Sequence, residues 1–170
     1  MLNIKKLSSV KGFTLVELLV VIAIIGVLAT LILLQLGTAR AKARDAKRIS
    51  DVSQIRTAAE LYFDDNNGRF PNAISVANLG AYFSTPTIPV DPTTGVGYFY
   101  AYTPAAIPVG FHLWIELERN NAAALRGDFD INSTGWSGNA FNASVAGTEA
   151  CTANYNAGAA RDCVYDVGQR

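Results

Sequence analysis

The sequence of 170 residues predicts an α+β fold in which one long N-terminal helix packs on a small antiparallel β-sheet. Residues 18–39 carry no charge over 22 positions, and apolar residues then recur at three- and four-residue steps through residue 63. Further on, residues 111–118 alternate between apolar and polar side chains, as a half-buried strand does. The chain therefore combines a helix whose apolar face has to be buried with a strand whose apolar face can pack against it.

The uncharged run is long enough to cross a membrane once, because about 20 apolar residues span a bilayer. Residues 1–12 form a short basic leader with three lysines and no acidic side chain. Glu17 lies near the start of the run, where an unpaired carboxylate is disfavoured, although by less than the roughly 2.5–3.5 kcal/mol of the bilayer centre. Cleavage after Gly12 would give Phe13 a cationic amine, one helical turn from Glu17. That amine neutralises Glu17 in its own chain or in a packed neighbour, and the second arrangement makes the pair an assembly device.

Residues 11–26, with the sequence KGFTLVELLVVIAIIG, resemble the N-terminus of prepilins, the precursors of type IV pilins and of type II secretion pseudopilins. The resemblance implies that a prepilin peptidase cuts between Gly12 and Phe13 and then N-methylates Phe13. It also implies that Phe13 and Glu17 of adjacent subunits meet during filament assembly. An uncleaved signal anchor is the alternative. Many family members carry a proline inside the apolar helix, whereas residues 31–36 have none.

These features predict four parts: a leader peptide at 1–12, a transmembrane and assembly helix at 13–39, the amphipathic half of the same helix at 40–67, and a globular pilin-like head with a disulfide-bounded C-terminal tail at 68–170. Removal of the leader leaves 11 basic and 14 acidic side chains. This slightly negative balance does not favour nucleic acid as a partner.

The amphipathic half carries an apolar stripe made of Ile49, Val52, Ile55, Ala59 and Tyr62. Arg48 and Asp51 are expected on its other faces. The helix should end near residues 66–68, because Asn and Gly adopt the left-handed conformation of a helix cap. A short helix is expected at 76–83, and strands are expected at 98–102, 111–118 and 163–167. The apolar face of the second strand, from Phe111 to Leu117, should pack on the long helix.

Cys151 and Cys163 are the two cysteines of the chain. The prepilin resemblance places them in an oxidising compartment, where one disulfide between them is the simplest arrangement. A loop of this size would stabilise the fold by about 3 kcal/mol in the chain-entropy description. Two free thiols are the alternative.

Asp128, Asp130 and Asn132 supply oxygen atoms at alternate positions, as the start of a calcium loop does. Ser133 stands where an EF-hand requires glycine, and Asn139 replaces its bidentate glutamate, so an EF-hand is excluded. An irregular calcium site and a solvated acidic turn both remain open. The resemblance to major pseudopilins, which bind calcium in a C-terminal loop, adds weight to the first, but the ligand positions do not align clearly and the solvated acidic turn is the favoured interpretation. No other cofactor or metal is predicted.

Arg40, Arg44 and Arg48 form a basic stripe beside the apolar run. Such side chains typically reach lipid headgroups or contact other subunits, and specific capture of DNA is a less favoured alternative. Lys47 and Asp51 are four residues apart and are expected to pair along the helix.

Groups suited to catalysis are few. His112 is expected on the polar face of its strand with no second histidine or cysteine nearby. Trp114 and Trp136 are interpreted as half-buried packing residues rather than stacking platforms for a ligand. No Ser/His/Asp arrangement or glycine-rich phosphate loop is apparent, so an enzyme is not predicted.

The favoured interpretation is a structural subunit of a type IV pilus-like filament, assembled through its N-terminal hydrophobic helix after prepilin peptidase processing. A pseudopilin of a type II secretion system is the alternative, and a membrane-tethered binding domain that never polymerises is less favoured. Expected partners are further copies in a helical filament, a prepilin peptidase, an inner-membrane assembly platform and membrane lipid. The precursor would be a single-pass membrane protein and the product an extracellular or periplasmic filament.

Overall fold

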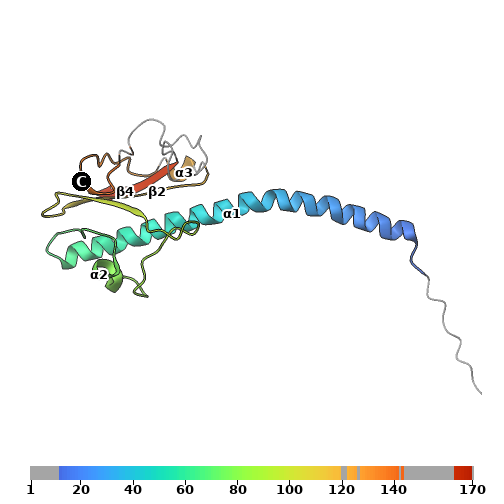
Figure 1. Ribbon diagram of the computed structural model, residues 1–170, viewed down its shortest axis with the longest axis horizontal. Coiled ribbons are helices and arrows are strands. Elements are labelled where there is room, and N and C mark those ends of the chain that lie inside the picture. Colours follow the sequence, from blue (N-terminus) through green and yellow to red (C-terminus); the bar gives the residue numbers. More distant parts are fainter. Residues whose placement is uncertain (1–11, 120–121, 126, 142, 144–162, 170) are drawn as a thin grey trace, which may run out of the picture. The chain divides into compact units, whose positions relative to one another are not determined.

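The computed structural model describes residues 12–119, 122–125, 127–141, 143 and 163–169. Helix α1 (Leu15–Asp65) leads the chain and is followed by helix α2 (Val76–Leu79) with a 3-10 turn (Gly80–Tyr82). The remaining elements are β1 (Phe99–Thr103), β2 (Gly110–Glu116), α3 (Ala122–Leu125), β3 (Ser137–Gly138) and β4 (Val164–Gln169) (Figure 1). The predicted α+β fold is confirmed. The chain divides into two compact units, Met1–Ala39 and Arg40–Arg170.

Helix α1 ends as its sequence predicts. Asn67 and Gly68 both adopt positive φ angles, of 56° and 71°. The N–H of Gly68 then donates to the carbonyl oxygen of Phe63 at 3.0 Å, which closes the last turn of the helix. The short helix expected at 76–83 is present as α2 and the 3-10 turn, and the hydroxyl of Ser75 accepts the N–H of Asn78 at its start.

The four strands form one antiparallel sheet in the order β3-β1-β2-β4. Tyr100 pairs with Leu113 across β1 and β2, and Leu113 pairs with Val167 across β2 and β4. The three predicted strands are therefore present, with bounds shifted by one or two residues. The two-residue strand β3 was not predicted, because its sequence Ser-Gly carries no strand preference.

The main core lies between the sheet and the second half of α1. The apolar face of β2 packs there as predicted, with Phe111, Leu113 and Ile115 all buried. The helix contributes small and β-branched residues, and the full set on α1 is Val52, Ile55, Ala58 and Ala59. Such side chains allow a helix to approach a sheet closely.

The opposite face of the sheet is also buried, which differs from the prediction. His112 is fully buried rather than on a polar surface, and Trp114 is 1% exposed. Trp114 stacks on Phe99 at 4.1 Å between ring centroids and packs against Phe141. The segment 128–143 therefore covers this face. Trp114 lies on the side of β2 that the alternation of apolar and polar residues marks as polar. The alternation therefore does not indicate that this side of the strand is buried as well.

Candidate functional site

The start of α1 is built by a capping box. Thr14 is the N-cap: its N–H and its hydroxyl donate to Oε2 of Glu17 at 2.8 and 2.7 Å, and its hydroxyl accepts the N–H of Glu17 at 3.2 Å. Gly12 and Phe13 precede the helix in non-helical backbone and are exposed, with Phe13 at 77%. The spacing Thr-x-x-Glu is a readable cap signature, although the sequence reasoning used Glu17 only as a charge partner.

The described residues of the apolar half of α1 have no protein cover. Every described residue from Gly12 to Arg40 is exposed. Leu18, Ile22 and Ile25, for example, have exposed fractions of 59%, 60% and 58%. This stretch is the one part of the described chain that is long and apolar enough to cross a membrane. A contiguous apolar surface of this size is characteristic of contact with lipid or with other protein chains.

The basic stripe that follows is only partly exposed: Arg40 is exposed, Arg44 is half-buried, and Arg48 is enclosed, which corrects the expectation of a lipid-facing or subunit-facing position for Arg48 alone. Arg48 is fully buried, and its Nη1 donates to Asp45 Oδ1 at 2.9 Å and to Glu118 Oε1 at 2.7 Å. Its Nε donates to Asp91. Arg44 pairs with both carboxylate oxygens of Glu118. We call these five residues the neck ion cluster.

The neck ion cluster ties three segments of the head together: α1, the turn at Asp91 and the chain just after β2. Burial opposes the charge of Arg48, but its hydrogen bonds with Asp91 and Glu118 outweigh burial and raise its pKa. Hydrogen bonding from Arg44, reinforced by Arg48, lowers the pKa of Glu118 to about 2. Arg48 and Glu118 therefore stay charged at neutral pH. Arg48 was expected on a face away from the core. It stands four residues before Val52, one helical turn along the same face, and this spacing could have indicated its burial.

Lys47 and Asp51 make the predicted pair, with Nζ 2.9 Å from Oδ2 of Asp51. Asp51 is nevertheless buried, contrary to the expectation that it faces away from the core. The hydroxyl of Tyr98 donates to the same carboxylate at 2.7 Å, so the buried acid is partnered on both sides. Burial and this hydrogen bond raise the pKa of Tyr98.

A serine, a histidine and an aspartate come together on the second face of the sheet, an arrangement that the sequence reasoning missed. Nδ1 of His112 is 2.7 Å from Oγ of Ser133, and its Nε2 is 3.0 Å from Oδ2 of Asp166, although the ring N–H is not aligned with that oxygen. All three residues are buried, with exposed fractions of 0%. Oγ of Ser133 also accepts the N–H of Phe141 at 2.8 Å. The group therefore fastens segment 128–143 to the sheet and offers no accessible nucleophile.

The predicted calcium loop lies next to this group. Carboxylate oxygens of Asp128, Asp130 and Asp166 lie within 4.8 Å of one another, and Asp166 was not foreseen. Burial and the neighbouring Asp166 raise the pKa of Asp130. Asp166 already accepts the N–H groups of Asp130 and Ile131 at 3.0 and 2.8 Å. Oδ1 of Asn132 accepts the N–H of Thr134 and so closes its own turn. Calcium binding by Asp128, Asp130 and Asn132 stays a prediction.

The predicted disulfide involves one described residue. Cys163 is buried in the main core, at 3% exposure, directly before β4. Cys151 lies outside the described residues, so the pairing stays a prediction.

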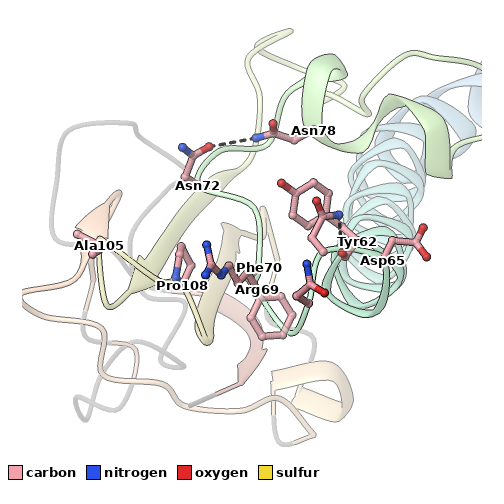
Figure 2. Close-up of a pocket in the computed structure, with 11 residues that line it drawn as sticks. Tyr62, Asp65, Arg69, Phe70, Asn72, Asn78, Ala105 and Pro108 are labelled. Carbon is pink, nitrogen blue, oxygen red and sulfur yellow. Dashed lines mark hydrogen bonds between the residues drawn. The ribbon is translucent and has the colours of Figure 1, made fainter.

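A polar groove of about 490 Å³ lies at the far end of α1 (Figure 2). Its walls come from the last turn of α1, the segment after it, and the turn between β1 and β2. The labelled side chains that line it include Tyr62, Asp65, Arg69, Asn72 and Asn78, and an amide hydrogen bond of 3.2 Å joins Asn78 to Asn72. The groove is open and polar, and none of its labelled polar side chains is buried.

Comparison with known proteins points to the same N-terminal region. The family described as a prokaryotic N-terminal methylation motif matches residues 7–33. The type II secretion system core protein G of Dickeya chrysanthemi is 39% identical over 82 residues, which cover 48% of this chain and 52% of that protein. The type IV wide pilus major component of Thermus thermophilus is 39% identical over 74 residues, covering 44% of this chain and 56% of that protein.

A fimbrial protein of Pseudomonas aeruginosa is 46% identical over 50 residues, which cover 29% of this chain and 32% of that protein. The similarity to the type II secretion proteins spans about half the length of each relative. No solved structure matches the chain significantly. The chain therefore carries the N-terminal methylation motif of prepilins on a pilin-like α+β architecture, with relatives among both type II secretion pseudopilins and type IV pilins.

Proposed function

We propose that this protein is a structural subunit of a type IV pilus-like filament, assembled through the apolar half of α1 after cleavage between Gly12 and Phe13. The observation that carries the proposal is an apolar helix half without protein cover that begins at the methylation motif. Pilins and pseudopilins are structural subunits, and we infer that this chain likewise has no catalytic role. Contacts between copies that do not close into a ring extend into an open fibre, so one subunit type suffices.

Glu17 has a second role in this proposal besides capping. Both donors of Thr14 contact Oε2, and within the described part of the chain no donor contacts Oε1. A carboxylate offers about four acceptor positions, so a further cationic donor can be accommodated without breaking the cap. Cleavage would expose the amine of Phe13, which would be N-methylated and would meet Glu17 of a neighbouring copy. The pair then sets the register, and packing of the apolar helices supplies most of the cohesion.

The experiment separates capping from charge pairing. Glu17→Gln keeps an acceptor for the N–H of Thr14 but removes the charge, since Gln also serves in a capping box. Thr14→Ala removes the hydroxyl that donates to the carboxylate and accepts the N–H of Glu17, but keeps the carboxylate. The full-length variants are expressed with an active prepilin peptidase. Filaments are then sheared from the cells and quantified, and the N-terminus of the processed chain is identified by mass spectrometry.

We expect processing at Phe13 in all variants, and a loss of sheared filament of about tenfold or more for Glu17→Gln and Glu17→Ala. The reason is that an amine without its partner in apolar surroundings is costly. Thr14→Ala should assemble at near wild-type levels. If Glu17→Gln assembles normally, charge pairing between copies is wrong. If the unaltered chain stays monomeric despite processing, the filament function is wrong.

The alternative function is that of a pseudopilin of a type II secretion system, supported by the relatives named core protein G. Long polymers in the sheared surface fraction favour a pilus, whereas short periplasmic assemblies favour a pseudopilus. Both functions use the same partners: other copies, a prepilin peptidase, an inner-membrane assembly platform and membrane lipid. Neither requires a cofactor, and calcium at the Asp128 loop would act on the stability of the head.

A further inference from the structure

The exposed surface of the second half of α1 carries positive charge at its start and negative charge at its end. Arg40 and Lys42 are exposed at its start, which we call the basic start. Glu60, Asp64 and Asp65 are exposed near its other end, which we call the acidic end. Within the described residues, no ion pair involves Arg40, Lys42 or Asp64. Glu60 pairs with Arg56 at 2.8 Å, so the charges without an ion pair among the described residues are Arg40 and Lys42 at the basic start and Asp64 and Asp65 at the acidic end.

The acidic end is unfavourable in the isolated chain. The last turn of α1 contains Asp64 and Asp65 and no basic residue. The C-terminus of a helix carries a partial negative charge, so carboxylates there are repelled and cations are favoured. The hydroxyl of Tyr82 donates to Asp65 at 3.0 Å, which is a neutral partner and leaves the charge uncompensated. A helix end of this kind gains from an external cation.

The surface between the two ends permits close approach. Exposed residues recur there at three- and four-residue steps and are small, namely Ala43, Ala46, Ser50, Ser53 and Thr57. The hydroxyl of Thr57 donates to the carbonyl oxygen of Ser53 at 3.0 Å and so stays folded against the helix. Lys42 and Asp64 lie on the same side of α1 as these residues by helical spacing. The face is thus made of small side chains as far as Leu61, and the exposed cations beside it, Lys47 and Arg56, pair along the helix with Asp51 and Glu60.

We propose that the basic start of one copy docks on the acidic end of another copy in the filament. The two groups are separated by about 33 Å along α1, from 22 residues at about 1.5 Å each. Two parallel copies displaced by that distance bring Lys42 of one level with Asp64 of the other. Because a second copy carries both complementary ends, the contact repeats along an open fibre. This inference rests on the filament function and adds the surface through which the heads are held in register.

A charge swap tests the docking. Lys42→Glu and Asp64→Lys each place like charges together, and the double variant restores opposite charges with the net charge of the original chain. Arg119→Glu is the matched control, since it changes net charge as Lys42→Glu does but lies outside α1. Full-length chains are expressed as above, and sheared filaments are quantified together with processed protein in the membrane. Resistance of the head to limited proteolysis reports whether each variant is folded.

We expect each single variant to lose sheared filament several-fold, although its head stays folded and its N-terminus is processed. The double variant should return to within about twofold of the original amount, a difference of roughly 0.4 kcal/mol or less. Arg119→Glu should assemble normally. The docking is wrong if the double variant yields no more sheared filament than the poorer single variant. It is also wrong if Lys42→Glu yields as much filament as Arg119→Glu while Asp64→Lys yields little. Loss of filament from Glu17→Gln with retention in both single charge variants would uphold the filament function and reject the docking.

Discussion

The two halves of α1 share one continuous helix but meet opposite surroundings. In the first half every described side chain is exposed, whereas in the second half Val52, Ile55 and Ala59 are buried beneath the sheet. The second half obtains its cover from its own chain, and the first half lacks such cover. Under the proposed function, burial of the first half comes from lipid or from other copies. Assembly and folding of the head are, on this basis, separable properties.

The largest effect on the head is expected from the neck ion cluster. Arg48→Met removes a fully buried cation that contacts Asp45, Asp91 and Glu118. Three carboxylates are then left together without their shared partner, which should cost about 3–5 kcal/mol of unfolding free energy. Urea unfolding of the detergent-solubilised protein, followed by tryptophan fluorescence, measures the loss. A change below about 1 kcal/mol would contradict the view that the cluster fastens α1 to the head.

A smaller effect is expected from Gly168 in β4. A Cβ atom at this position would stand closer than 3.0 Å to the carbonyl oxygen of Phe111 and to Cδ1 of Ile131. Gly168→Ala therefore forces apart the β2–β4 ladder, at a cost of about 1–3 kcal/mol. Gly97→Ala is the control, because nothing lies within 4 Å of its Cβ position, and its effect should stay within about 0.5 kcal/mol. Equal unfolding midpoints for the two variants would refute the steric argument.

Acid should weaken the head before it affects the apolar helix. The pKa of Glu118 is about 2 in the folded chain against an ordinary value of 4.5, and the pKa of Asp91 is also lowered. Groups with depressed pKa values stabilise the fold fully above their unfolded values and lose that contribution as pH falls. We expect the unfolding midpoint to drop between about pH 4.5 and 2, and Glu118→Gln to flatten the slope. A midpoint independent of pH in this window would show that the cluster contributes no net stability.

The smallest effect is expected on the outer surface of α1. Lys47 pairs with Asp51 but is 53% exposed, so Lys47→Ala should cost about 0.3–0.5 kcal/mol. Tyr98→Phe removes the buried hydrogen bond to the same carboxylate and should cost more, about 1.5–3 kcal/mol. Unfolding curves of the two variants compare an exposed and a buried partner of one acid. The reverse order would mean that the exposed pair carries the stability of Asp51.

The elements of the fold could be predicted because each has a local signal. The uncharged run, the Asn-Asn-Gly end of α1 and the alternation in β2 are written in neighbouring residues. The position of Glu17 beside the predicted cleavage site is local in the sequence for the same reason. The contacts of Arg48 with Asp91 and Glu118 span 43 and 70 residues in sequence, and no local pattern relates those positions. Likewise, His112 meets Asp166 through the pairing of β2 with β4, and meets Ser133 through the segment that covers the sheet.

The sequence alone determined the long helix, its apolar first half and the motif at its start, since hydrophobic periodicity and capping act between residues a few positions apart. Only the tertiary structure decided which charged side chains are available. It enclosed Arg48 and Asp51 and left Lys42 and Asp64 exposed, although all four lie on one helix. The reason is that burial depends on what packs against each face of the helix, and that cover comes from segments distant in the chain.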